Sequence, residues 1–117
     1  KSNGIRTSIF IEPDENMVKG AKNIGADRVE LYTETYATSF HQNPKKAILP
    51  YLKAALVANK LEIGINAGHD LNLKNISYFA ENIPQLLEVS IGHALISESL
   101  YLGFENVIPM YLQRLSR

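Results

Sequence analysis

Short apolar segments alternate along the chain with longer segments in which apolar residues recur at helical spacing. The apolar segments lie at residues 7–12, 28–33, 61–66 and 86–91. Their content of Ile, Val, Leu and aromatic residues predicts β-strands. Elsewhere the apolar residues recur every three or four positions, which predicts helices with one buried face. We expect these helices between residues 14 and 25, after residue 43, between residues 72 and 84, and over 97–102 and 104–115.

Asparagine and proline residues mark the limits of several predicted helices. Asn43 followed by Pro44 is typical of a helix start, because Asn caps free backbone N–H groups and Pro fits the first helical position. Asn72 is a similar cap for a later helix. Pro50 and Pro109 fall inside predicted helices, where proline removes a backbone hydrogen bond. We therefore expect the helix at Pro50 to be kinked or divided, and Pro109 to disturb the middle of the last helix.

The alternation of strands and helices predicts the α/β class, with parallel strands joined by right-handed crossovers. The apolar runs of the strands are nearly continuous, which is typical of a sheet covered on both faces. A (β/α)₈ TIM barrel takes about 250 residues. A chain of 117 residues therefore supplies about half of such a barrel. A small open sheet fits the same pattern, so the strands alone leave both architectures open.

Composition narrows the functional classes. Acidic and basic residues balance at 12 each, so no overall field attracts nucleic acid or an anionic membrane surface. No apolar stretch reaches the length of a membrane span. The chain has no cysteine, which excludes disulfides and thiolate chemistry within it and fits a cytoplasmic protein. We expect a single folded domain that binds neither nucleic acid nor membrane.

Two Gly-His pairs end consecutive predicted strands and precede helices. Gly68-His69 follows the third strand, and Gly92-His93 follows the fourth. In a parallel sheet the carboxyl ends of strands and the beginnings of helices converge at one edge, where ligands bind. Glycine lets the backbone approach a ligand, and imidazole transfers protons near neutral pH. The repetition points to one shared site.

His69 and Asp70 each have a functional and a structural interpretation. His69 is a candidate general acid or base, but a strand-end histidine also serves to bond a loop carbonyl. Asp70 is able to hold the imidazole or to cap the following turn. Because adjacent side chains in a strand point in opposite directions, a direct His69–Asp70 pair is the less expected of these arrangements.

Gly92 and His93 are candidates for a phosphate site. Backbone N–H groups at the start of the following short helix would face an anion. The alternative is that Gly92 permits close packing of the strand against a helix. The presence of a short helix before Gly103 favours phosphate, since such a helix is common at the phosphate sites of barrels.

Glu30 is a carboxylate in the middle of an otherwise apolar strand. Such a charge is costly unless it is paired or faces a wet cavity. It therefore either lines the site, where it would stabilise positive charge or move a proton, or forms a buried ion pair with a residue such as Arg28. His41 lies in a polar loop and is expected to be solvated. No spacing typical of metal ligands or cofactor motifs occurs, so we expect neither a metal nor a cofactor.

Four segments together resemble one enzyme family. Residues 8–13 (SIFIEP), 25–33 (GADRVELYT), 66–71 (NAGHDL) and 90–96 (SIGHALI) look like the pyridoxine 5′-phosphate synthase family. The resemblance runs from about Gly4 to the end of the sequence. It implies a TIM barrel enzyme of vitamin B6 synthesis. The family condenses 1-deoxy-D-xylulose 5-phosphate with 3-amino-2-oxopropyl phosphate, closes the pyridine ring, and releases phosphate and water.

The resemblance also implies roles for particular residues. His69 matches the proton-donating histidine of the family, and Glu30 matches a glutamate that stabilises charged intermediates. Gly92 and His93 match the backbone-rich site for the phosphate of the amino-ketone substrate. Asp70 stands where the family often has glycine, so its backbone N–H remains a phosphate donor while its side chain adds a negative charge.

By the same resemblance, residues 1–117 correspond to the last four βα units, the C-terminal half of one barrel domain. The family's N-terminal half carries further bases and arginines, so the fragment alone is expected to be inactive. Its expected partners are phosphorylated substrates, the missing half and further copies of itself. Tyr101, Phe104 and Tyr111 are candidates for an oligomer interface or for packing of the last helix. The alternatives are a non-catalytic phosphate-binding half-barrel and a different phosphate-binding barrel enzyme.

Overall fold

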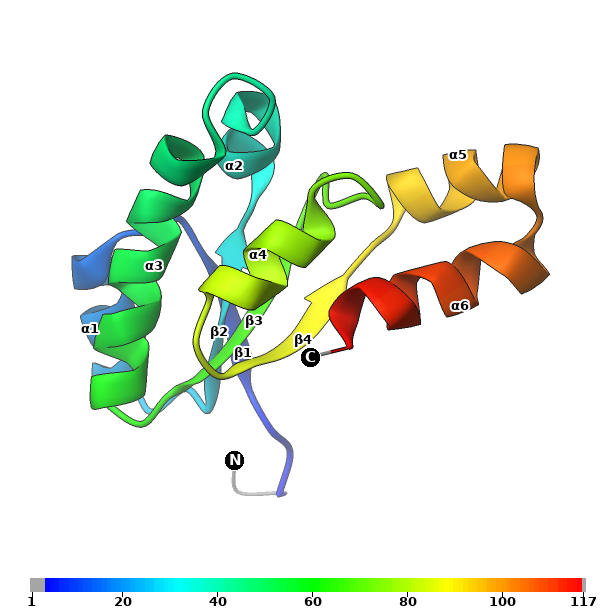
Figure 1. Cartoon of the computed structure of the whole chain (residues 1–117). Helices are drawn as coiled ribbons and strands as arrows, with labels where there is room; N and C mark the ends of the chain where they lie inside the picture. Colours follow the sequence, from blue (N-terminus) through cyan, green and yellow to red (C-terminus); the bar gives the residue numbers. More distant parts are fainter. Residues whose placement is uncertain (1–3, 117) are drawn as a thin grey trace.

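The structure is a computed structural model that describes residues 4–116. It consists of a layer of strands with helices packed against it (Figure 1). In chain order the elements are β1 (Ser8–Ile11), α1 (Glu15–Asn23), β2 (Arg28–Tyr32), α2 (Glu34–Ser39), α3 (Pro44–Lys60), β3 (Gly64–Gly68), α4 (Ile76–Asn82), β4 (Leu86–Ser90), α5 (His93–Leu102) and α6 (Phe104–Leu115).

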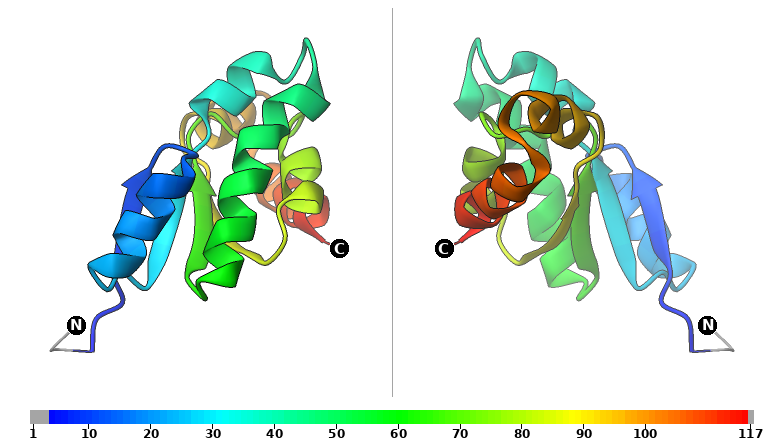
Figure 2. Two further views of the ribbon diagram at one scale, coloured as in Figure 1. Left: turned by 90° about the vertical axis from the view of Figure 1, so that its left-hand side faces the viewer. Right: turned by 90° about the vertical axis from the view of Figure 1, so that its right-hand side faces the viewer.

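The strands form one four-stranded parallel sheet in the order β1-β2-β3-β4. The α/β class and the parallel arrangement predicted from the sequence are thus confirmed. Each new strand is added on the same side of the previous one, and right-handed crossovers then carry every connecting helix over the same face of the sheet. Figure 2 shows α3, α4 and α6 together on that side. Within residues 4–116 the helices therefore cover one face of the sheet, which differs from the two covered faces expected from the apolar runs.

The covered face holds the main core. Val29 and Leu31 of β2 and Ile65 and Ala67 of β3 are buried there against the helices. The face of α3 that meets the sheet is rich in alanine, whose small side chain lets a helix approach the strands closely. Burial of these apolar side chains is the main force that holds the helix layer on the sheet.

The other face of the sheet is polar. Arg28, Glu30, Asn66 and Glu88 alternate with the buried residues, and the Arg28 guanidinium lies 2.7 Å from a Glu88 carboxylate oxygen and donates to Asn66 at 3.1 Å. Since successive strand residues point to opposite faces, the polar face is encoded by this alternation. The strands read as mostly apolar in the sequence because their polar residues occur singly, each between apolar residues.

Both prolines lie within unbroken helices. Pro50 lies inside α3, which runs continuously from Pro44 to Lys60, and Pro109 lies inside α6. Of the two alternatives expected at Pro50, a kink or a division, the division is therefore wrong. Pro50 and the residue one turn before it, Lys46, are both exposed, so water can satisfy the carbonyl that loses its partner. Asn43 caps α3 as predicted, through a bond from the Lys46 N–H at 3.1 Å.

Several elements differ from those read in the sequence. The helix α4 begins at Ile76 rather than directly after Asn72, whose side chain instead accepts from the N–H groups of Lys74 and Asn75 before the helix. The third strand begins at Gly64 rather than at residue 61, because Leu61 ends α3 and Glu62 has a positive φ of 59°. The helix α5 begins directly at His93 rather than at residue 97. The short helix α2 was not predicted. Its six residues are too few for a clear apolar period.

The last two helices carry a second, smaller cluster. Val107 and Tyr111 of α6 are buried against Ile76 of α4, and the Tyr111 hydroxyl donates to Glu98 of α5. Tyr111 is only 4% exposed, so its interface interpretation is wrong and it packs the last helix instead. Tyr101 is 89% exposed, and Phe104 is also exposed.

Candidate functional site

A hollow of about 390 Å³ opens at the carboxyl edge of the sheet, on its polar face. Its lining combines residues within β1 and β2 with residues that end or follow β3 and β4, because the ends of parallel strands meet at one edge. All five residues predicted for the site line this hollow, together with Phe10, Ser90 and Ile91: they are Glu30, His69, Asp70, Gly92 and His93. The structure thus brings the predicted residues together, while their chemical roles stay predictions.

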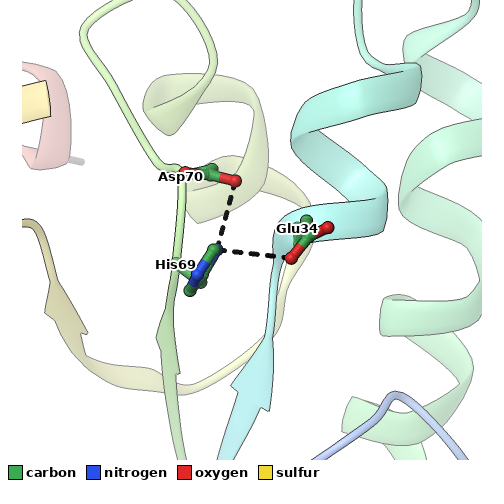
Figure 3. A group of neighbouring side chains, drawn as sticks. All are labelled: Glu34, His69 and Asp70. Carbon is green, nitrogen blue, oxygen red and sulfur yellow. Dashed lines mark ion pairs between the residues drawn. The ribbon is translucent and has the colours of Figure 1, made fainter. Parts of the chain in front are cut away.

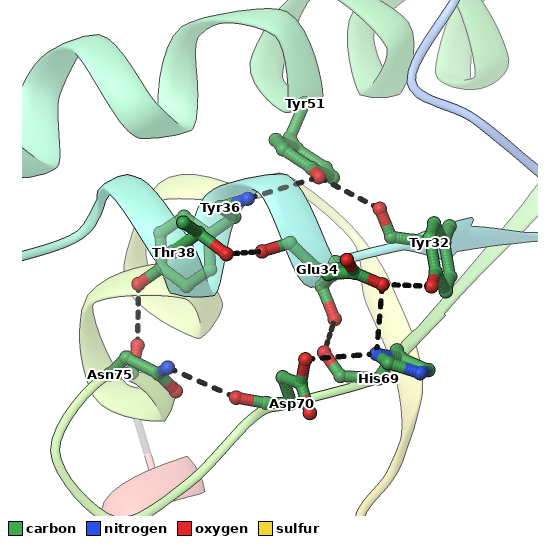
Figure 4. Close-up of polar contacts among 9 residues, drawn as sticks. Tyr32, Glu34, Tyr36, Thr38, Tyr51, His69, Asp70 and Asn75 are labelled. Atoms are coloured by element: carbon green, nitrogen blue, oxygen red, sulfur yellow. Dashed lines mark hydrogen bonds and ion pairs between the residues drawn. The ribbon is translucent and has the colours of Figure 1, made fainter.

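His69 and Asp70 form a tight turn directly after β3. Both have positive φ, 97° for His69 and 59° for Asp70, a conformation that is unfavourable for residues other than glycine. Two side chains hold this turn (Figure 4): the Thr33 hydroxyl donates to the His69 carbonyl, and the Asn75 amide donates to the Asp70 carbonyl at 3.3 Å. A strained backbone conformation persists only where surrounding contacts hold it. Here the contacts come from Thr33 after β2 and from Asn75 before α4.

The His69 imidazole lies between two carboxylates (Figure 3). Its Nδ1 is 3.1 Å from Oδ2 of Asp70 and 3.8 Å from Oε2 of Glu34. The direct His69–Asp70 pair was the less expected arrangement, and that expectation is wrong. The strand ends at Gly68, so the alternation of side chains does not extend to a turn with positive φ.

Tyr32 completes the surroundings of the imidazole. Its ring centroid lies 4.6 Å from that of His69, and its hydroxyl donates to Glu34 (Figure 4). This hydrogen bond to Glu34 is the main reason that the pKa of Tyr32 is raised to about 12. Tyr32 therefore remains a neutral donor to Glu34 at neutral pH and orients that carboxylate.

Glu30 lies on the polar face of β2, and it is part of the lining of the hollow. Burial, and secondarily the negative charge of Glu88, raises the pKa of its carboxyl group. Arg28, the alternative partner considered for Glu30, pairs with Glu88 instead. A Cβ added at Gly68 would lie 2.8 Å from the Glu30 carboxylate. Glycine at that position is thus what leaves room for Glu30.

Gly92 and His93 form the start of α5 beside the hollow. Gly92 is the N-cap, and no side chain of the described residues caps this helix. A Cβ added at Gly92 would meet no atom within 4 Å, so close packing does not explain this glycine. A helix start without a side-chain cap presents N–H groups and a positive dipole end, which suits an anion.

Several residues of the site were missed in the sequence. Tyr32, Thr33 and Glu34 follow β2 just as His69 and Asp70 follow β3, so the argument from strand ends would have placed them at the same edge. Asn75 had no such signal. His41 lies in a turn and is exposed, away from the lining of the hollow, in accord with the expected solvated loop.

Metal-ligating atoms gather at one point of this edge. One ligand atom each from Glu34, His69 and Asp70 lies within 4.8 Å of the others, and all three residues are exposed. Attraction between an imidazolium and two carboxylates is sufficient to explain this grouping. Among residues 4–116, no helix has the length and apolar character needed to cross a membrane.

The fold and the hollow define the class of protein: a parallel α/β chain with a candidate anion-binding and proton-transferring site at the carboxyl edge of its sheet. A family model described as "Pyridoxal phosphate biosynthesis protein PdxJ" matches residues 1–117. The chain belongs to this family, and the family resemblance read in the sequence is confirmed.

Similar proteins carry one name. The chain is 62% identical over 113 residues to a pyridoxine 5′-phosphate synthase of Flavobacterium johnsoniae, a match that covers 97% of this chain and 48% of that protein. It is 58% identical to the proteins of the same name from Christiangramia forsetii and Cytophaga hutchinsonii, with 98% and 100% of this chain and 48% and 49% of those proteins covered. The chain thus spans about half the length of the curated relatives it matches.

Proposed function

We propose that residues 1–117 form the C-terminal half of a (β/α)₈ barrel. In the described residues β1 pairs only with β2 and β4 only with β3, so both edges of the sheet have unpaired backbone groups. Such edges promote aggregation unless further strands cover them. The relatives are about twice as long as this chain. Strands from that additional length, added at β1 and β4, would close the barrel and place the polar face inside it.

We further propose that the complete protein is a pyridoxine 5′-phosphate synthase. It would condense 1-deoxy-D-xylulose 5-phosphate with 3-amino-2-oxopropyl phosphate and release phosphate and water. The observation that supports this proposal most directly is the single hollow lined by Glu30, His69, Asp70, Gly92 and His93, in a chain of this family. It joins a proton-transferring group, a partly buried carboxylate and a helix start without a side-chain cap, which suits a phosphorylated substrate that loses water.

His69 is the proposed proton donor. Imidazole exchanges protons near neutral pH, and the braced turn after β3 holds it at the edge of the hollow. When it protonates a leaving hydroxyl group, the C–O bond breaks, water departs and the imidazole becomes neutral. Glu30 lies across the same hollow, where an ionised carboxylate would stabilise a cationic intermediate.

The phosphate of the amino-ketone is proposed to bind at the start of α5. The N–H groups at His93 and after it, and the space beside Gly92, suit an anion there. The backbone N–H of Asp70 is a further candidate donor. The Asp70 carboxylate lies toward the imidazole, and pairing with His69 reduces its repulsion of a phosphate.

The last two expectations concern the cellular location of the protein and its assembly. We propose a cytoplasmic protein that assembles with further copies of itself. Exposed apolar residues on α5 and α6, among them Leu100, Tyr101 and Leu112, support such an assembly.

The test is an assay of the full-length protein with both phosphorylated substrates. We expect pyridoxine 5′-phosphate and inorganic phosphate to appear in equal amounts. Phosphate binding without product would contradict the proposal and favour a non-catalytic phosphate-binding module. Product from other sugar phosphates alone would favour a different barrel enzyme.

A further inference from the structure

The surroundings of His69 are asymmetric about its ring. Nδ1 faces two carboxylate oxygens, from Asp70 at 3.1 Å and from Glu34 at 3.8 Å. Both contacts are ion pairs, so the negative charges of the two carboxylates act on Nδ1. A proton on Nδ1 is therefore favoured at this position, and an unprotonated Nδ1 would face two negative charges. Which ring nitrogen carries the proton of a neutral histidine is set by such contacts.

Glu34 is itself held in place. Its carboxylate accepts from the Tyr32 hydroxyl, and its backbone carbonyl accepts from Thr38 at 2.9 Å (Figure 4). The Tyr32 ring also packs against the imidazole at 4.6 Å. Tyr32 thus contacts both partners of the Glu34–His69 ion pair. Glu34 lies at the first residue of α2, on a different strand end from His69, so the contact joins two βα units.

We propose that Glu34 is a positioning residue that, with Asp70, keeps a proton on Nδ1 of His69 and leaves Nε2 to exchange protons with the substrate. When Nε2 gives up its proton, the electron pair of the N–H bond stays on the ring and the neutral Nδ1–H form remains. The negative charges of Glu34 and Asp70 stabilise the neutral Nδ1–H form of His69. They stabilise the imidazolium form more strongly, because it carries a full positive charge.

Other titratable groups face the same space. Tyr32 from β2 and the two carboxylates contact the imidazole directly, while Glu30 and His93 lie in the lining of the hollow. No ion pair joins Glu30 to His69 in the described residues. The effect on Nδ1 is therefore assigned to Glu34 and Asp70.

This inference rests on the proposed function, but one of its tests does not require activity. In full-length protein labelled with ¹⁵N-histidine, the nitrogen chemical shifts of neutral His69 report which nitrogen is protonated. We expect the Nδ1–H form. In the Glu34→Gln, Asp70→Asn double variant we expect a shift toward the Nε2–H form, with Glu34→Gln alone in between.

Kinetics supply the second readout. Exposed ion pairs contribute about 0.2–1 kcal/mol, so each single variant should lower kcat about 1.4- to fivefold. KM for the phosphorylated substrates should not rise, because the variants remove negative charge near a phosphate site.

Glu12→Gln is the matched control. Glu12 is an exposed acid after β1 at the same edge of the sheet, and no ion pair joins it to His69 in the described residues. It should leave the tautomer and kcat unchanged. A parent protein with the Nε2–H form, or a double variant with unchanged tautomer and unchanged kcat, would overturn the inference. A parent that makes no pyridoxine 5′-phosphate but shows the Nδ1–H form would contradict the proposed function alone.

Discussion

The two Gly-His pairs are alike in sequence and differ in structure. Gly68 is buried beneath Glu30 and Ser90, and His69 lies in a strained turn with its side chain between two carboxylates. Gly92 is open on the side where a Cβ would lie, and His93 is the first residue of a regular helix. The same dipeptide thus fixes a side chain at one strand end and exposes backbone N–H groups at the next.

The difference arises from the path that the chain takes beyond each strand. After β3 the chain turns sharply and is tied to Thr33 and Asn75, so the imidazole is held. After β4 the chain enters α5 within two residues, so the helix start itself is at the edge of the hollow. Side-chain chemistry is therefore expected at the first pair and anion binding at the second. Variants at the two pairs test this division.

The largest effect is expected at the first pair. His69→Ala should lower kcat of the full-length enzyme by about 10²- to 10⁴-fold, the range for loss of a general acid. KM should change little, because His69 is not assigned to the phosphate. Steady-state kinetics measure both. His41→Ala, at an exposed loop position, is the matched control and should retain activity. Equal kcat values for the two variants would remove His69 from the mechanism.

The two glycines should differ in stability. At Gly68 a Cβ would lie 2.8 Å from the Glu30 carboxylate and 3.1 Å from the Cβ of Ser90. Gly68→Ala should therefore cost about 1–3 kcal/mol of unfolding free energy, as overpacking does. Gly92→Ala meets open space and should cost less than about 1 kcal/mol, the typical effect at an N-cap. Denaturant titration measures both. A larger loss at Gly92 would contradict the contrast.

A charge at the second pair should weaken phosphate binding. Gly92→Asp places a carboxylate at the start of α5, where it caps the helix and repels a phosphate. We expect KM for 3-amino-2-oxopropyl phosphate to rise about two- to fivefold or more, from the energy of a charge at a helix end. Gly92→Asn has nearly the same size without the charge and should have a smaller effect. If both variants raise KM equally, space rather than charge explains the result.

The smallest effect concerns stability and pH. Burial and Glu88 raise the pKa of Glu30 above its ordinary value of 4.5, so folding favours the protonated carboxyl group. Glu30 therefore lowers the stability of the fold progressively as pH rises from about 4.5 through its folded-state pKa, and the loss is constant at higher pH. Glu30→Gln should raise Tm at neutral pH, and the gain should vanish below pH 4.5, where the carboxyl group is protonated in both states. Thermal unfolding across this range measures it. A gain that persists in acid would indicate another cause.

Much of the fold followed from local patterns. The order of the strands, the cap at Asn43 and the limits of α6 were all readable, because they depend on residues close together in the chain. The continuity of α3 through Pro50 was not readable from local pattern, since it depends on packing of the helix against the sheet. The start of β3 was also misplaced, because the end of α3 determines it.

The site was predictable in part. His69, Asp70, Gly92 and His93 were placed at one edge by their positions at strand ends, and they line one hollow. Glu30 lines the same hollow, and for this mid-strand residue the sequence had left a buried ion pair as the alternative. The contacts of His69 were not predictable. They depend on a turn with positive φ that is held by Thr33 and Asn75, residues from other elements.

The sequence by itself determined the α/β class, the parallel arrangement and the family, since these rest on periodicity and on motifs that are contiguous in the chain. Only the tertiary structure decided which face of the sheet stays open, that Arg28 pairs with Glu88, and that Glu34 approaches His69. These contacts join residues distant in sequence. Their geometry depends on strand register and on backbone conformation at the turns, which local pattern does not specify.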